Sequence, residues 1–271
     1  MSSSHLRAAS EFSGPDVLSG VNADGTPVSW FEGTWPFFSW AIFLFGAGIL
    51  AARSNNRDRH WYGWLAPVAY CLHQSEEHAY DLRGWRYSFV PSLNSGPIGS
   101  VYQEACKHAG DALSCPLDPK ITLYVNVLVV WLGFGGCMAA AALAPKRFLL
   151  AGSLNWGTAV INGLMGHVLP AVLTSSYNPG LVQSLFMVPL GAYLILESGR
   201  PGLCLVNGFL MHAMLVLGIN LIFRFHTGEA LTMSVLMVGS SLFLPLAISD
   251  YISSSSSSNT TTSNEDENKK Q

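Results

Sequence analysis

Long apolar runs, separated by short clusters of polar residues, dominate the chain between residues 35 and 250. A helix needs roughly 20 apolar residues to cross the hydrocarbon core of a bilayer, where every backbone polar group must be satisfied within the segment. The pattern therefore predicts an all-α, polytopic membrane helix bundle of about seven transmembrane helices. These runs lie near residues 35–52, 61–80, 120–143, 148–173, 181–198, 201–223 and 230–250.

The composition also indicates lipid as the main solvent of this chain. Of its 271 residues, 49% are hydrophobic and 11% are charged, whereas soluble proteins carry about 25% charged residues. The formal net charge is −3 and no basic patch of the size that nucleic acid requires is present. We therefore expect the lipid bilayer and an apolar small molecule as partners, with no nucleic acid. The oligomeric state stays open.

The two ends of the chain are polar. Residues 1–34 contain no positive start followed by an apolar stretch and a small-residue cleavage site, so they are not expected to form a secretory signal peptide. Residues 251–271 are rich in Ser, Thr and Asn and lack the apolar side chains that build a core, so a disordered tail is expected there.

The distribution of Lys and Arg predicts the orientation, because short loops with these residues stay in the cytoplasm. The loops after the first, third and fifth runs carry most of them, namely Arg53, Arg57, Arg59, Lys146, Arg147 and Arg200. The N-terminus would then be lumenal or extracellular, the C-terminus cytoplasmic, and the polar loop after the second run, 81–119, lumenal. We expect a multi-pass protein of the endoplasmic reticulum or another endomembrane.

Two cysteines, Cys106 and Cys115, share that polar loop. A disulfide between them is compatible with an oxidising compartment. Spacing along the chain does not establish the geometry that a bridge needs, so the free thiols remain an alternative.

The end of the second run carries the segment "CLHQSEEHAYDLRGW". His73, Glu76 and Glu77 stand at i, i+3 and i+4, so a helix would project them from one face, and Asp81 follows at a further i+4 step. A carboxylate at membrane depth costs about 2.5–3.5 kcal/mol and marks a functional site by default. Alternatively, the helix ends near Cys71 and the acids lie among lipid head groups and water.

The fourth and sixth runs share the pattern Asn-Gly-x-x-x-His, with Asn162 and His167 in one and Asn207 and His212 in the other. Five residues of α-helix turn through about 500°, which leaves Asn and His roughly 140° apart. Each Asn therefore either fixes a neighbouring helix, or a π-bulge realigns the Asn with its His.

The second, fourth and sixth runs enter from the same side of the membrane, so they are parallel. His73 and His167 then lie about two turns inside the lumenal face, at 1.5 Å per residue, and His212 lies a little deeper. The three histidines can thus meet Glu76 and Glu77, although each buried imidazole can instead serve as a hydrogen-bond partner of a neighbouring helix. Nitrogen and oxygen donors of this kind suit Zn or non-haem Fe, and the spacing leaves the metal's identity open.

Three functions follow from such a site. The first is an intramembrane, metal-dependent enzyme acting on a lipid or other apolar small molecule, either a hydrolase or an oxygenase, with His73, Glu76 or Glu77 in catalysis. The second is a metal-free acid/base isomerase or cyclase of an apolar substrate. The third is a proton-coupled membrane carrier. We expect supporting roles for Asp81, Asn162, Asn207 and Tyr177, the last as an interface anchor.

The segment "HQSEEH" beside "DLRGWRYSFVP", with an intramembrane His followed ten residues later by "YNPG", resembles the HXXEE-domain family of multi-pass membrane proteins. The resemblance covers about residues 60–200. It implies a multi-pass membrane protein whose histidines and acids form a site, but it supplies no reaction, because the family is largely uncharacterised. The matching residues are His73, Glu76, Glu77, His167, Tyr177, Pro179 and Gly180, and His212 is not part of this pattern.

Overall fold

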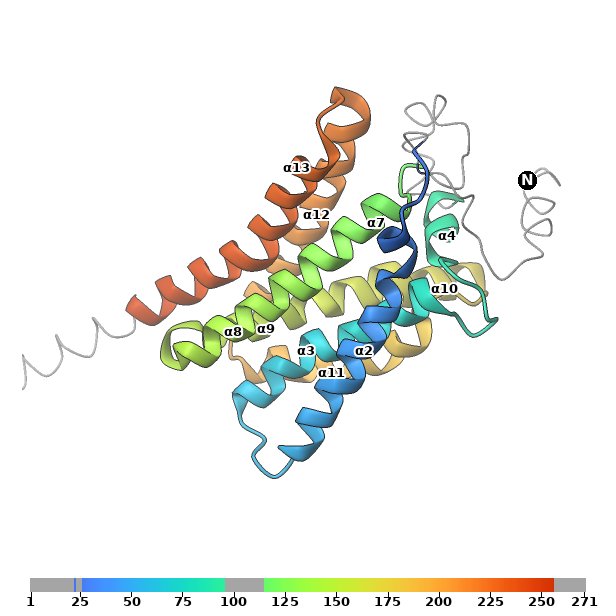
Figure 1. Cartoon of the computed structure of the whole chain (residues 1–271). Coiled ribbons are helices and arrows are strands. Elements are labelled where there is room, and N and C mark those ends of the chain that lie inside the picture. Colours follow the sequence, from blue (N-terminus) through green and yellow to red (C-terminus); the bar gives the residue numbers. More distant parts are fainter. Residues whose placement is uncertain (1–21, 23–25, 96–114, 256–271) are drawn as a thin grey trace, which may run out of the picture.

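The computed structural model describes Asn22, residues 26–95 and residues 115–255, and these parts form a bundle of helices (Figure 1). Four segments continue a helix in π form and are labelled η. In chain order the elements are α2 (Trp30–Ala52), α3 (Arg59–Gln74), η1 (Ser75–Ala79), α4 (Phe89–Ser95), α7 (Pro119–Asn126), η3 (Val127–Phe134), α8 (Gly135–Leu143), α9 (Pro145–Ile161), η4 (Asn162–Val168), α10 (Leu169–Thr174), α11 (Leu181–Glu197), α12 (Pro201–Phe225), α13 (Glu229–Met233) and η5 (Ser234–Phe243).

The all-helical prediction is confirmed for the described residues, and a helix occupies each of the seven predicted runs. Five helices are long and apolar enough to cross a membrane. The other two predicted spans are occupied by α3 with η1 and by α11, which has 17 residues. The number of seven crossings is therefore not established by length and composition alone. The five long helices are Trp30–Ala52, Pro119–Leu143, Pro145–Thr174, Pro201–Phe225 and Glu229–Ser255.

The helices begin where the sequence supplies capping residues. Ser29 and Glu32 form a capping box at the start of α2, in which each side chain bonds to the backbone N–H of the other residue. Asp58 accepts from the N–H of Trp61 at the start of α3, and Asp118 accepts from that of Ile121 at the start of α7. These caps satisfy N–H groups that a helix otherwise leaves without a partner.

α9 lies at the centre of the bundle and packs against α3, α8, α11 and α12. Small residues make two of these crossings possible. A Cβ built on Gly152 of α9 would lie 3.1 Å from Cα of Gly63 in α3, and one built on Gly157 would lie 1.9 Å from the carbonyl oxygen of Cys204 in α12. Close approach at small residues is the usual packing mode of helices in lipid, where hydrophobic burial does not drive association.

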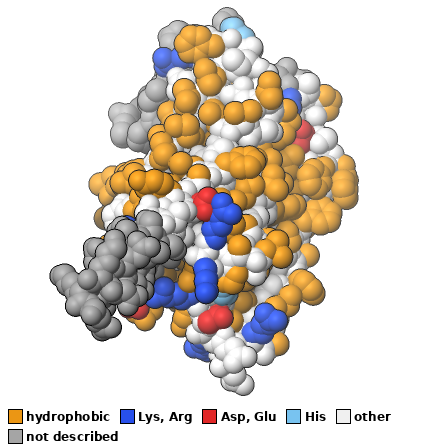
Figure 2. All heavy atoms as spheres, turned by 90° about the vertical axis from the view of Figure 1, so that its left-hand side faces the viewer, with side chains coloured by type: hydrophobic (Ala, Val, Ile, Leu, Met, Phe, Trp, Pro, Cys, Tyr) orange, Lys and Arg blue, Asp and Glu red, His pale blue; other side chains and the backbone are white. Residues whose placement is uncertain are grey.

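Large apolar side chains cover much of the outer surface. Figure 2 shows hydrophobic side chains over most of one face, with most of the charged side chains toward its lower part. The exposed residues include Phe45 of α2, Phe186 of α11 and Phe243 of η5, each more than 60% accessible. A soluble protein rarely exposes so much apolar area. The described part of the chain is therefore that of a helical membrane protein.

The C-terminal helix extends further than the sequence predicts. A disordered tail was expected from residue 251, but the helix continues to Ser255. In this last turn, the hydroxyls of Ser253, Ser254 and Ser255 each donate to the carbonyl four residues earlier, so these side chains find their partners on the helix itself. Residues 256–271 lie outside the described part of the chain.

The predicted disulfide can be followed at one end only. Cys115 is buried and takes part in a disulfide bond, whereas Cys106 lies outside the described residues. Of the other cysteines, Cys71, Cys137 and Cys204 are free and buried.

Candidate metal centre

The second helix does not end near Cys71, but continues as the π-helical turn η1 through Ala79. The backbone N–H of Tyr80 closes this turn on the carbonyl oxygen of Ser75, five residues earlier. Glu77 is 3% exposed and His73 is fully buried. The alternative in which these acids lie in water is therefore wrong.

Three side chains meet at one buried point, namely His73, Glu77 and His167 (Nε2, Oε1 and Nε2, respectively). The two imidazole nitrogens are 3.1 Å apart. Oε1 of Glu77 lies 3.3 Å from the nitrogen of His73 and 3.0 Å from that of His167. The three residues can hold a metal ion, since their ligand atoms all lie within 4.8 Å of one another.

The π-helix η4 brings His167 to this point together with Asn162. In a π-helix the hydrogen bonds join residues five apart, so residues at i and i+5 lie one above the other. Nδ2 of Asn162 is 3.1 Å from Nε2 of His73 and 3.4 Å from that of His167. The π-bulge alternative is thus confirmed for this motif, and Asn162 lies beside both histidines.

The loop before α11 holds His167 from the other side. Nδ1 of His167 lies 2.8 Å from Oδ1 of Asn178. With this oxygen as the acceptor, Nδ1 carries the proton, and the lone pair of Nε2 points toward His73 and Glu77. A hydrogen bond of this kind is the usual support of a metal-binding histidine. Nδ1 of His73 has no such partner among the described residues.

Gly180 lets the backbone of the same loop approach both imidazole rings. Its φ angle is +91°, and a Cβ there would lie 2.6 Å from Cε1 of His167 and 2.9 Å from Cε1 of His73. Both the positive φ and the lack of space exclude a side chain at this position. Gly180 therefore allows the loop backbone to pack directly against both imidazole rings and to cover the cluster on this side.

Glu76 does not join the three ligand atoms. Its Oε1 accepts from the hydroxyl of Tyr177 at 2.8 Å, and its two oxygens accept from the N–H groups of Val182 and Gln183 at the start of α11. Neighbouring helical residues point about 100° apart, so Glu76 and Glu77 cannot face the same point. The expectation that Glu76 is a metal ligand is therefore wrong. Glu76 instead caps the N-terminus of α11, where the helix dipole stabilises a carboxylate.

His212 also lies outside the three-residue cluster. Its Nδ1 contacts the carbonyl oxygen of Gly208 at 2.7 Å, and its Nε2 is 3.4 Å from Oδ1 of Asn162. Asn207 donates to the carbonyl oxygen of Leu154 in α9. Because α12 is a regular α-helix, Asn207 and His212 point in different directions. The expectation that His212 is a metal ligand is thus not met, and Asn207 fixes a neighbouring helix.

The loop between η1 and α4 is organised by Asp81. Its carboxylate accepts from the N–H groups of Arg83 and Trp85 and pairs with the Arg83 guanidinium at 2.6 Å. Burial raises the pKa of Asp81, but these hydrogen bonds outweigh it and leave the pKa below its ordinary value. Because the helix ends at Ala79, Asp81 does not continue the face of Glu77. It supports the site only through this loop.

Tyr177 connects that loop to the site. Its hydroxyl donates to Glu76 and accepts from the N–H of Leu82. Burial is the main cause that raises the pKa of this hydroxyl well above its ordinary range. Tyr177, which was expected to anchor the chain at the membrane interface, is therefore also a hydrogen-bond partner of Glu76, the residue that caps α11.

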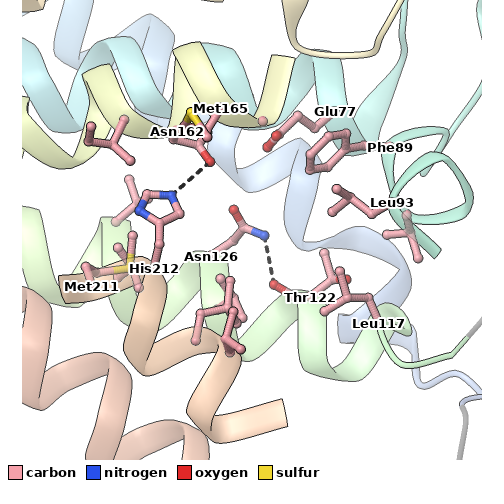
Figure 3. A pocket seen from close by; sticks show the side chains of 18 of the residues that line it. Glu77, Phe89, Leu93, Leu117, Thr122, Asn126, Asn162, Met165, Met211 and His212 are labelled. Atoms are coloured by element: carbon pink, nitrogen blue, oxygen red, sulfur yellow. Dashed lines mark hydrogen bonds between the residues drawn. The ribbon is translucent and has the colours of Figure 1, made fainter. Parts of the chain in front are cut away.

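A cavity of about 300 Å³ adjoins the cluster, lined mainly by apolar side chains from α3, η1, α4, α7, η3, α9, η4 and α12. Figure 3 shows Glu77 and His212 facing this cavity from opposite sides, with Asn162 beside His212. Glu77 lines the cavity, whereas His73 and His167 lie behind it. The carboxylate is therefore the member of the cluster that a bound molecule would meet.

Two residues beside the cluster, Asn178 and His78, were not among the predicted site residues. Asn178 belongs to the segment "YNPG", eleven residues after His167, and that separation gives no sign that the two side chains meet. His78 lies 3.4 Å from Oε2 of Glu77 and 3.3 Å from Nδ2 of Asn126. His78 is the last residue of "HQSEEH", and it does not fall on the i, i+3, i+4 face that begins at His73.

The comparison with known families bears on the same segment. Residues 64–194 match the family described as "Protein of unknown function with HXXEE motif". The chain carries an HXXEE domain. The motif is His73, Glu76 and Glu77, and the domain also includes η4 with His167 and the loop with Asn178 and Gly180. His212 lies beyond its end. No curated protein and no solved structure matches the chain.

Proposed function

We propose that this HXXEE protein is an intramembrane enzyme that binds one divalent metal ion through His73, Glu77 and His167. Its substrate would be a lipid or another apolar small molecule. One observation carries the proposal: two imidazole nitrogens and a carboxylate oxygen lie 3.0–3.3 Å apart in a buried place beside an apolar cavity.

The spacing suits a metal ion. At bond lengths of about 2.1 Å, atoms 3.0–3.3 Å apart are seen from the ion at angles of roughly 90–105°. This range lies between the octahedral and the tetrahedral value, so both Fe²⁺ and Zn²⁺ fit. Two histidines and one carboxylate are the ligand set of non-haem Fe²⁺ oxygenases and of several Zn²⁺ hydrolases.

The electrostatics of the cluster also call for a cation. Glu77 is 3% exposed, and among the described residues it pairs with histidines and with no lysine or arginine. A buried carboxylate needs a compensating charge or a proton. The lone pair of His167 Nε2 points into the same space, so a divalent ion would neutralise the carboxylate and bind both nitrogens at once.

When bound, the ion would activate water if it is Zn²⁺, or oxygen if it is Fe²⁺. The residues of this chain hold its ligands in place and keep bulk water away. Asn178 fixes the tautomer of His167 through Nδ1, and the apolar wall of the cavity favours a substrate that dissolves in lipid.

The membrane topology is part of the proposal. We infer that α3 with η1 and α11 also cross the membrane, which gives seven spans, with the loop after η1 and the N-terminus on the lumenal side. In support, α3 packs between α2 and α9. In addition, Arg147 in the first turn of α9 pairs with Asp250 near the end of the last helix, so these two helix ends lie together. A protease-protection assay with tags in residues 1–21 and 256–271 tests this orientation, and protection of both tags in sealed vesicles would contradict it.

Metal analysis of the purified protein tests the function. Wild type, produced with Fe and Zn in the medium, is expected to carry one divalent ion per chain. His167→Ala and Glu77→Gln should lose it, because each removes one of three ligands. The matched controls are His212→Ala and Glu76→Gln, which change the same residue types just outside the cluster and should keep the metal. Wild-type protein that takes up no divalent ion, or equal metal in Glu77→Gln and Glu76→Gln, would falsify the proposal.

A metal-free isomerase or cyclase is a second candidate, and one observation favours it. Only Glu77 of the cluster lines the cavity, and His78 lies beside its other oxygen, an arrangement suited to moving a proton to and from an apolar substrate. Lipid substrates incubated with the membranes in heavy water should then incorporate deuterium without added metal. Incorporation that depends on Glu77 and survives chelation supports this candidate, whereas its loss on chelation supports the metalloenzyme. The proton-coupled carrier stays a prediction.

A further inference from the structure

The cavity beside the cluster lies where two helices separate. α9 and α12 cross at Gly157 and Gly208, where a Cβ on Gly208 would lie 2.5 Å from the carbonyl oxygen of Gly157. Beyond this crossing the chain of α9 continues as η4 and α10, and Figure 1 shows α10 and the end of α12 well apart. The cavity occupies the space between η4 and the second half of α12.

The rim of the cavity is apolar and open to the outside of the bundle. Met165 of η4 and Phe209 and Val216 of α12 line the cavity, yet they are 52%, 54% and 47% exposed. Both helices belong to candidate membrane spans. The opening between them therefore faces hydrocarbon rather than water.

The inner end of the cavity is polar but holds no permanent positive charge. Glu77, Asn162 and His212 provide a carboxylate, an amide and an imidazole, and no lysine or arginine is among the lining residues. Without a metal ion, a phosphate or a carboxylate brought here would be an unpaired buried anion beside Glu77, which is costly. An uncharged polar group, such as a hydroxyl or an ester, can instead form hydrogen bonds with the amide and the imidazole.

We propose that the substrate is an uncharged single-chain lipid that enters sideways from the bilayer, between η4 and the second half of α12. Its polar end lies between Glu77 and His212, and its chain passes Met165 and Val216 into the membrane. A volume of about 300 Å³ is at the lower limit of small-molecule pockets, so the cavity holds the polar end and part of the chain while the rest stays in lipid. This inference rests on the proposed function in taking the cavity as the substrate site.

Photo-crosslinking in proteoliposomes tests this route. The probe is a long-chain alcohol that carries a diazirine near its hydroxyl group, and the matched probe is the phosphate ester of the same alcohol. In the metal-free protein, the alcohol should label lining residues near Glu77 and His212, as read by peptide mass spectrometry, whereas the phosphate should not. Both should label the outer groove between α2, α3 and α11, a space of about 540 Å³ lined by Phe43 and Phe186 that serves as an internal reference.

Substitutions at the rim locate the opening. Met165→Trp and Val216→Trp should abolish labelling inside the cavity and leave the outer groove labelled. Leu173→Trp, at a position that is 75% exposed but does not line the cavity, should change neither. Val216→Ala, which widens the opening, should increase inner labelling. Inner labelling that is equal in wild type and both rim variants, or absent from wild type when the groove is labelled, would overturn the proposal.

The same readout separates this inference from the proposed function. Labelling needs no metal, so His167→Ala should lose the ion and still be labelled inside the cavity. Metal without inner labelling would contradict the lateral route alone. Inner labelling of a wild-type protein that binds no metal would contradict the metalloenzyme alone.

Discussion

The two Asn-Gly-x-x-x-His motifs have the same spacing but do different things. In η4 the backbone is π-helical, and Asn162 and His167 both point to the buried cluster. In α12 the backbone is α-helical, so Asn207 reaches α9 while His212 faces the cavity. The widened turn, and not the residue types, makes one motif part of a site and the other a packing contact.

The glycines of the motifs show a similar contrast. A Cβ on Gly163 would meet a methyl group of Val188 at 2.6 Å, whereas one on Gly208 would meet the backbone of Gly157. A side chain can move, but the backbone at a helix crossing cannot. The second motif therefore holds two helices together, and its histidine is linked to the three-residue cluster only through Asn162.

Deleting one residue in each motif should give the largest difference. A π-turn contains one residue more than the α-helix it interrupts, so deletion of Leu164 should restore an α-helix and keep Asn162 and the histidine on one face. Deletion of Leu210 should turn the rest of α12 by about 100°, which moves its buried face into lipid. We expect the first variant to remain folded and to bind metal, and the second not to fold, as judged by gel filtration and metal content.

Both deletions remove an exposed leucine that does not line the cavity, so each serves as the control of the other. If the Leu164 deletion loses the metal and the fold while the Leu210 deletion keeps both, the role assigned to the π-turn is wrong.

The two asparagines should show opposite effects. Asn162→Ala removes an amide that competes with an ion for the Nε2 atoms of both histidines, so it should tighten metal binding by up to about 10-fold, the equivalent of one hydrogen bond, and change stability little. Asn207→Ala removes one hydrogen bond between helices and should cost about 1 kcal/mol of stability with unchanged metal affinity. Metal titration and thermal unfolding in detergent measure the two quantities. The same metal affinity in both variants would contradict the contrast.

The smallest difference is expected from the glycines. Gly208→Ala should cost about 1–3 kcal/mol of the free energy of unfolding, because its Cβ meets backbone that cannot yield. Gly163→Ala should cost less, since Val188 can change its rotamer. Chemical denaturation of the two purified variants in the same detergent gives this comparison, and a larger cost for Gly163→Ala would reverse the assignment.

Much of the fold could be predicted from periodicity. The length of the apolar runs correctly predicted a helix in each of the seven, because a spanning helix requires a long, unbroken stretch of apolar residues. The ends were less predictable, as at residues 251–255, where the helix continues into a polar segment and serine hydroxyls bond to carbonyls of the preceding turn. Length and composition alone did not establish the crossings of α3 and α11.

The candidate site was predicted in part. His73, Glu77 and His167 were found because ionisable residues in apolar runs are conspicuous, and Asn162 was found through the repeated motif. The sequence could not separate Glu76 from Glu77, because which of two adjacent carboxylates faces a site depends on the rotation of the helix. Nor could it tell that the first motif is π-helical and the second is not, since the two motifs share their residues and spacing.

Gly180 has a consequence for recognising this site in other chains. The absence of one carbon atom lets the turn before α11 rest on both imidazole rings. A chain with the same histidines and glutamates but a bulkier residue here could not bring the two rings together in this way. A search for similar sites should therefore require this glycine as strictly as it requires the histidines.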